Sequence, residues 1–175
     1  SAGNVKLGNL FMNDTGNKKD IPAAIYYYEL AAKQNNPEAL FVLAELYSSG
    51  DIVEIDLKKA IEYLIKCVGI SKEKRTNYNQ IFGKISMSFN YNEFFYHANN
   101  SLGLIYLIYE HNIEKANQYI KEAAFAEYPF GQNNYGLLNQ LYLDDKVKAN
   151  HFFERSSKSI HFHPVDFDDF LKNWI

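Results

Sequence analysis

The sequence predicts an all-α solenoid built from about four helix-turn-helix repeats. The chain resembles itself when it is shifted by 36 positions, and its C-terminal part does so at a shift of 33. Each repeating segment carries two apolar patterns at helical spacing, separated by turn-forming residues. Self-similarity at a fixed period in the thirties is typical of stacked helix pairs that share one elongated core. We therefore expect repeats at about 4–36, 37–69, 93–128 and 129–159, an irregular insert at 70–92 and a C-terminal cap at 160–175.

The length and composition are those of one globular domain spanning residues 1–175. The 16% aromatic content, mostly Tyr and Phe, suits a thin layered fold, because a tyrosine ring can be buried while its hydroxyl reaches water. A net charge of -3 gives no long-range attraction to nucleic acid or anionic lipid. No apolar run approaches the roughly 18 residues that cross a bilayer. We expect no nucleic-acid partner and no membrane insertion.

The sequence favours a cytoplasmic location without fixing it. Cys67 is the one cysteine of the chain, so no intrachain disulfide forms, which is compatible with a reducing compartment. The first residues, Ser1-Ala2-Gly3, resemble a processed or added start, and export therefore stays open. The compartment, the source and the oligomeric state are not determined by these features.

The first expected repeat contains two helices joined by a polar turn. An apolar stripe at helical spacing, Leu7 to Phe11, marks the first helix, and turn-forming residues follow at 13–17. Asp20 precedes Ile21-Pro22, which is typical of an N-cap followed by proline in the first helical turn. A second helix is then expected to about residue 33, with an apolar side formed by Ala24, Tyr27, Tyr28 and Ala31.

The second expected repeat copies the first. Its first helix spans about Pro37 to Ser48, and Gly50 follows as a terminator. Asp56, the equivalent of Asp20, caps a second helix that is expected to end at about Val68.

Small residues recur where the two helices of a repeat have to meet, because a larger side chain would push the backbones apart. Cys67 occupies the position equivalent to Ala31. This position predicts a buried helix contact for Cys67 and not a nucleophile, which would need exposure and a basic partner. The other positions of close approach are expected at Gly8, Ala24, Ala31, Ala44 and Ala60.

Residues 70–92 interrupt the repeat rhythm. They represent either an inserted helix with loops or a decayed repeat that kept its core residues, and we favour an extra helix at about 76–88 with loops on both sides. Beyond them, the helices of the third repeat are expected at about 94–109 and 114–126, and those of the fourth at about 132–143 and 146–159.

The segment after Ser159 differs from the repeats. His161-Phe162-His163-Pro164 is expected to be extended or turn-like, because the residue before proline is disfavoured in a helix. Residues 166–175 are compatible with a short amphipathic helix that covers the last exposed face of the solenoid. Its apolar stripe would consist of Phe167, Phe170, Leu171 and Trp174.

The repeats resemble Sel1-like repeats, which are relatives of tetratricopeptide repeats. The resemblance rests on the pattern A-x-x-x-L-[GA]-x-L-Y, a Gly loop, and D-x-x-K-A-x-x-Y-x-x-x-[AC]. In this sequence the pattern is Ala39 to Tyr47, Gly50, and Asp56 to Cys67. Partial copies occur in the other repeats, most clearly at 102–106 and 114–124.

This resemblance implies a right-handed α/α superhelix whose first helices line a concave side. Members of the family are typically described as adaptors and assembly scaffolds without catalysis, and some belong to bacterial secretion and toxin-neutralising systems. It implies no cofactor and a protein or peptide partner. The concave residues that we expect to bind it are Asn9, Met12, Phe41, Glu45, His97, Asn100, Leu104, Leu107, Asn133, Leu137 and Gln140.

The sequence does not favour a metal site, a catalytic histidine or a phosphate-binding loop. His161 and His163, with Asp166, Asp168 and Asp169, have the residue types of a metal site, but a third fixed ligand is missing and a plain capping segment is favoured. His97, His111 and His151 are placed on separate elements without a recognisable catalytic partner. No glycine-rich phosphate loop is present.

Three functions remain in competition. The favoured one is a non-enzymatic protein-binding module or adaptor that grips a partner in its concave groove. The alternative is an immunity or inhibitor protein that neutralises a toxin or effector enzyme by plugging its active site, and the compact acidic chain fits this role equally well. A hydrolase or metal enzyme built on the tail histidines is the least favoured of the three.

Overall fold

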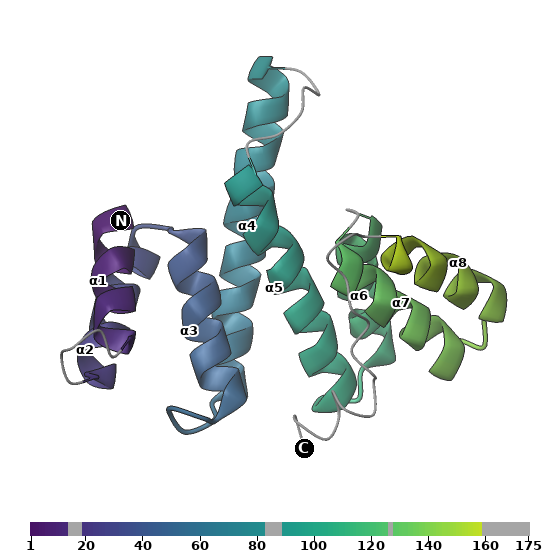
Figure 1. The fold of residues 1–175 in the computed structure, drawn as a ribbon, viewed down its shortest axis with the longest axis horizontal. Helices are drawn as coiled ribbons and strands as arrows, with labels where there is room; N and C mark the ends of the chain where they lie inside the picture. Colours follow the sequence, from purple (N-terminus) through teal and green to yellow (C-terminus); the bar gives the residue numbers. More distant parts are fainter. Residues whose placement is uncertain (14–18, 83–88, 126–127, 159–175) are drawn as a thin grey trace. The chain divides into compact units, whose positions relative to one another are not determined.

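A computed structural model of the chain describes residues 1–13, 19–82, 89–125 and 128–158, with side chains described throughout except at 74–82 and 89–92. These residues contain eight α-helices and no strand (Figure 1), which confirms the predicted all-α fold of helix pairs. The helices are α1 (Ala2–Met12), α2 (Ile21–Lys33), α3 (Pro37–Ser49), α4 (Leu57–Phe82), α5 (Phe89–Ile108), α6 (Ile113–Phe125), α7 (Pro129–Leu141) and α8 (Lys146–Ser157).

The chain forms two compact units, Ser1–Ala98 and Asn99–Ile175, and the boundary between them falls inside α5. In the first unit α1 packs on α2, α2 on α3, and α3 on α4. In the second unit α6 packs on α7 and α7 on α8, while Gly103 of α5 lies against Ile120 of α6. Each unit is therefore a row of helix hairpins, and the assignment of residues 1–175 to a single domain stays a prediction.

The small residues lie where the sequence predicts close helix contacts. Ala24, Ala31 and Ala60 are completely buried, and Ala44 is 1% exposed. Gly8 of α1 is buried against the Tyr28 ring of α2, and a Cβ at this glycine would lie 2.6 Å from a ring carbon. The close approach of the hairpin helices thus depends on the absence of larger side chains.

One residue closes the loop and caps the second helix in each hairpin. The backbone N–H of Asp20 donates to the carbonyl oxygen of Phe11 (3.0 Å), and its Oδ1 accepts from the N–H of Ala23 (3.0 Å). This arrangement satisfies donors that a helix N-terminus leaves unpaired. The same pair of bonds is made by Asp56, Asn112 and Asp145.

The length of this closed loop explains the two sequence periods. The capping residue lies nine positions after its carbonyl partner in the first two hairpins and six positions after it in the last two. The three-residue difference equals the difference between the periods of 36 and 33. The carbonyl partners are Phe11, Tyr47, Tyr106 and Asn139.

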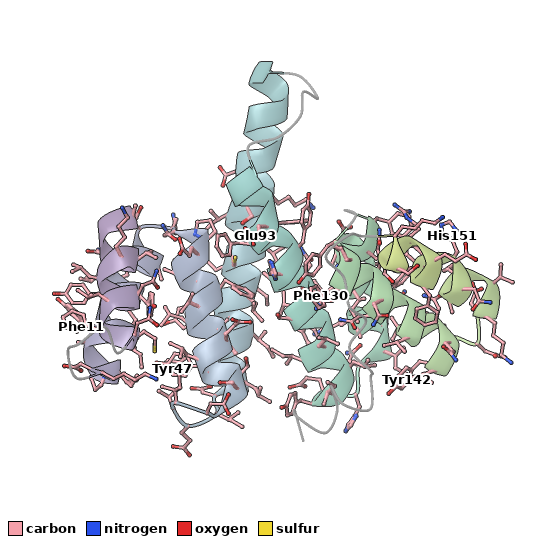
Figure 2. The ribbon with its side chains drawn as sticks, in the orientation of Figure 1. Phe11, Tyr47, Glu93, Phe130, Tyr142 and His151 are labelled. Carbon is pink, nitrogen blue, oxygen red and sulfur yellow. The ribbon has the colours of Figure 1, made fainter. Side chains whose placement is uncertain are left out.

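An aromatic pair stacks across each of the first three hairpins. One ring comes from the end of the first helix, and the other comes from the second helix, seven positions after the capping residue. The equivalent position in the fourth hairpin is held by Asn139, which is fully buried and donates from Nδ2 to the carbonyl oxygen of Tyr135 (2.7 Å). Two of these rings, Phe11 and Tyr47, are labelled in Figure 2. The stacked pairs are Phe11–Tyr27 (5.5 Å), Tyr47–Tyr63 (6.1 Å) and Tyr106–Tyr119 (5.6 Å).

Helix α4 is longer than the sequence predicts. The expected end at Val68, followed by a loop and a separate helix at 76–88, is wrong, because α4 continues without a break to Phe82. Gly69 costs only about 1 kcal/mol inside a helix, and no proline follows it before residue 82. The charged run at 72–75 consists of good helix formers. Helix α5 likewise begins at Phe89 instead of residue 94.

The predicted C-terminal cap at 160–175 lies outside the described residues, as do the candidate metal ligands His161, His163, Asp166, Asp168 and Asp169. Among the helices that the structure describes, none has both the length and the apolar character that crossing a bilayer requires.

Candidate functional site

The positions predicted to contact a partner differ widely in exposure. Those that are buried are Phe41, Asn100, Leu104 and Leu107. Those that are partly exposed are Asn9, Met12, His97, Asn133 and Leu137, and those that are exposed are Glu45 and Gln140. The members of this set that lie at the surface are thus polar or partly apolar, while the two leucines on α5 contribute mainly to packing.

Within the first unit, the structure brings two predicted positions from successive repeats into contact. The ring of Phe41 on α3 lies 5.5 Å from the ring of His97 on α5, and 6.0 Å from the ring of Phe94. Glu45 lies one helical turn after Phe41, and Glu93 lies one turn before His97, so both carboxyl groups share the faces that carry the rings. Figure 2 shows Glu93 on α5. We call Phe41, Glu45, Glu93, Phe94 and His97 the aromatic–acidic cluster.

His97 is a neutral ring at pH 7. Burial of the imidazole lowers its pKa below the ordinary value of 6.5, and Glu93 opposes this shift only in part. The His97 Nε2 atom lies 3.6 Å from Glu93 Oε1, and the Glu93 side chain is 60% exposed. Water therefore screens the attraction that would otherwise favour the charged imidazolium.

The Glu45 side chain is exposed, but protein atoms around its carboxyl group displace part of the surrounding water. Partial desolvation raises its pKa above the ordinary value. No described side chain forms an ion pair with it. At neutral pH the cluster thus presents two carboxyl groups beside aromatic rings, and none of its members is a cation.

The predicted positions of the second unit are partly engaged in internal contacts. Asn134 Nδ2 on α7 donates to Asn100 Oδ1 on α5 (2.9 Å), so the Asn100 amide ties two first helices together. The residue that makes this bond is Asn134 and not its neighbour Asn133, which is the position predicted from the sequence. Leu137 and Gln140 follow on the same helix and remain at least partly exposed.

In the first hairpin, Asn9 also has a structural role. The Tyr28 hydroxyl donates to Asn9 Oδ1 (2.6 Å), which ties α1 to α2. Met12, the other predicted position on α1, is partly exposed.

Sequence reasoning missed Glu93 and Phe94. A signal for Glu93 was present, because it lies four residues before His97 and therefore on the same face of a helix. Phe94 had no comparable signal: its position beside Phe41 follows from the packing of α5 on α3, 53 positions away in the chain.

Cys67 is buried, as predicted, and is not poised for nucleophilic chemistry. Desolvation raises the pKa of its thiol to about 12. The Sγ atom donates to the carbonyl oxygen of Pro37 (3.4 Å) and lies 3.8 Å from that of Phe94. The described residues contain no group of three or more His, Cys, Asp or Glu side chains arranged to hold a metal ion.

Solved structures similar to this chain include proteins from Oxalobacter formigenes, Pseudomonas aeruginosa and uropathogenic Escherichia coli. A Sel1 repeat protein from Oxalobacter formigenes is 18% identical, with a TM-score of 0.41; the match covers 91% of this chain and 71% of that protein. An immunity protein from Pseudomonas aeruginosa is 17% identical, with a TM-score of 0.39, covering 89% of this chain and 64% of that one.

The third similar structure is a protective antigen of uropathogenic Escherichia coli, described as displaying an SLR fold. It is 19% identical, with a TM-score of 0.40, and the match covers 89% of this chain but 37% of the antigen. No match was found among curated proteins.

The sequence model of the Sel1 repeat matches residues 1–36, 37–66 and 129–161, which together make up more than half of the chain. The first match contains the hairpin α1–α2, the second contains α3 and the first part of α4, and the third contains α7–α8. The intervening hairpin α5–α6 is not matched, although it shows the same loop closure at Asn112 and the same aromatic stack. The chain belongs to the Sel1 repeat family.

Proposed function

We propose that this chain is a non-enzymatic protein-binding module that holds a protein or peptide partner on the first helices of its repeats. The observation that carries the proposal is the contact between buried Phe41 and partly exposed His97, which brings together predicted binding positions of two successive repeats. Sel1 repeat proteins are in general protein-interaction modules, and membership in this family supports the same conclusion.

The chemistry of the exposed positions also supports a protein partner. Rings, carboxyl groups and amides lie on helices whose backbones are fixed by packing, so little ordering is needed when a partner binds. Interfaces of this kind combine a few aromatic anchors with a polar rim. In the first unit, exposed Glu45 would belong to such a rim.

The alternative function, an inhibitor that plugs the active site of a toxin or effector enzyme, would use the same surface. The acidic net charge of -3 is compatible with it. An activity assay on the toxin encoded by a neighbouring gene separates the two functions, because an adaptor leaves catalysis intact whereas an inhibitor abolishes it.

The test begins with affinity capture of the partner from the native cell and its identification by mass spectrometry. Binding of the purified partner is then measured by calorimetry with the full chain and with surface variants. Glu45→Lys on α3 is expected to weaken binding, with little change in melting temperature, because its side chain is exposed. Glu62→Lys is the matched control, since Glu62 is exposed on α4, a second helix of the same unit.

Because the predicted apolar anchors are buried, truncating them would change the stability of the protein as well as its binding. From the sequence, Phe41→Ala and Leu104→Ala are expected to weaken binding without loss of stability. Phe41 is only 9% exposed and Leu104 only 7%, so both variants would also leave cavities and destabilise the protein. Equal affinity of the wild type, Glu45→Lys and Glu62→Lys for the identified partner would contradict the proposed surface.

A further inference from the structure

We propose that the aromatic–acidic cluster receives an arginine side chain of the protein partner. This inference rests on the proposed function and specifies the chemistry of the residue that the partner presents. It is carried by the contacts of the Phe41 ring with Phe94 and His97, by Glu93 Oε1 at 3.6 Å from His97 Nε2, and by Glu45 one helical turn after Phe41.

Charge complementarity selects a basic side chain. Glu45 and Glu93 are both exposed, and they lie on the faces of α3 and α5 that also carry the contacting rings. No member of the cluster is a cation at neutral pH, and none of the described side chains pairs with Glu45. An acidic side chain entering beside these rings would be repelled by like charge, which opposes binding.

The rings favour arginine over other cations. A guanidinium group is planar, stacks on aromatic faces and donates several hydrogen bonds in one plane, so one group can contact a ring and a carboxylate together. Phe94 and His97 are partly exposed and supply the ring surfaces, while Phe41 lies beneath them. A lysine ammonium would satisfy a carboxylate but would gain less from the ring planes.

The neutral state of His97 contributes to this selectivity. A neutral imidazole adds an aromatic surface without charge, whereas an imidazolium would repel the incoming cation. Glu93 Oε1 lies 3.6 Å from His97 Nε2, and on α3 Glu45 lies one turn from Phe41, whose ring contacts His97. The arrangement thus places carboxyl groups on both helices that contribute a ring.

The experiment is a titration of the full chain, labelled with ¹⁵N, with two blocked pentapeptides that differ in one side chain. One peptide carries arginine at its centre between alanines, and the other carries citrulline, a neutral group of almost the same shape. The arginine peptide is expected to shift the amide signals of residues 41–45 and 93–97 and to bind about fivefold more tightly than the citrulline peptide. Added salt is expected to reduce the difference.

Substitutions of the two cluster carboxyl groups test whether they cause the preference for the arginine peptide. Glu45→Gln and Glu93→Gln keep the size of the side chain and remove its charge, and each is expected to reduce the preference for arginine. Glu62→Gln on α4 removes a charge of the same unit outside the cluster and is expected to leave the preference unchanged.

Three results would overturn the inference. They are equal affinity for the two peptides, an arginine preference that survives both cluster substitutions, and the absence of saturable shifts up to about 10 mM peptide, a concentration at which even very weak binding is visible. None of these would contradict the proposed function, because that function is tested separately, by the affinity of the identified partner for the wild type and for Glu45→Lys.

Discussion

Gly131 on α7 lies directly against Ala123 on α6. A Cβ at Gly131 would lie 2.7 Å from the Cβ of Ala123 and 2.8 Å from its carbonyl carbon. The second of these atoms belongs to the backbone and cannot rotate away, unlike the end of a flexible side chain. The packing of α6 on α7 therefore requires glycine at position 131.

Replacing Gly131 with alanine is expected to destabilise the protein by about 1–3 kcal/mol, because the two helices have to separate to admit one methyl group. Gly69→Ala is the matched substitution within another helix, where a Cβ would meet no atom within 4 Å. It is expected to stabilise the protein by about 0.5–1 kcal/mol, because alanine has the higher helix propensity. Urea denaturation of both variants measures these changes, and equal stability of the two would contradict the close packing at Gly131.

Loss of a helix cap is expected to destabilise the second hairpin. The Asp56 Oδ1 atom accepts from the N–H of Lys59 (2.9 Å), so Asp56→Ala leaves this donor without its partner. The expected cost is about 1 kcal/mol, and Asp56→Asn should retain most of the stability because its amide oxygen also caps. Chemical denaturation provides the measurement. Asp51→Ala, in the same loop and exposed, is the control, and a similar loss there would show that the effect is not one of capping.

The stability of the first unit is expected to depend on pH through His97. Its pKa in the folded protein lies below 6.5, mainly because the ring is buried. Above about pH 6.5 the imidazole is neutral in both states and its contribution to stability is complete. As the pH falls below this value, the unfolded chain binds a proton that the folded chain does not, and the free energy of unfolding decreases.

Urea denaturation at about pH 7.5 and about pH 5.5 tests this dependence in the wild type and in His97→Gln, which stays neutral throughout. The variant should lose less stability on acidification than the wild type. His151→Gln on α8, where the histidine is exposed, is the matched control and should follow the wild type. If His97→Gln and the wild type lose the same stability, the pKa of His97 is not lowered by folding.

The thiol of Cys67 is expected to be unreactive in the folded protein. It is fully buried, and its pKa of about 12 leaves almost no thiolate at neutral pH. A chromogenic disulfide reagent should therefore modify Cys67 at the rate of unfolding, and rapidly after addition of denaturant. Fast modification of the native protein would show that α4 opens at this point. Cys67→Ala should cost on the order of 1 kcal/mol, since it removes one buried atom.

The sequence alone determined the repeat architecture, because the physics involved is local. The equivalence of Asp20 and Asp56 predicts two N-caps, and both are present, since a cap depends on atoms three residues apart. The recurrence of Ala24 and Ala60 predicts close helix contact, and both are fully buried. Local pattern also explains the error at α4, because an isolated Gly69 weakens a helix without ending it.

The tertiary structure decided which residues beside the core stripe remain available to a partner. Leu104 and Glu45 were given the same role from sequence, yet the first is 7% exposed and the second is exposed at the surface. Periodicity identifies the face of a helix but not how much of its flank a neighbour covers, because coverage depends on side chains distant in the chain. The contact between Phe41 and His97 also depends on the tertiary structure, because only the packing of α5 on α3 brings together two rings that lie 56 positions apart in the chain.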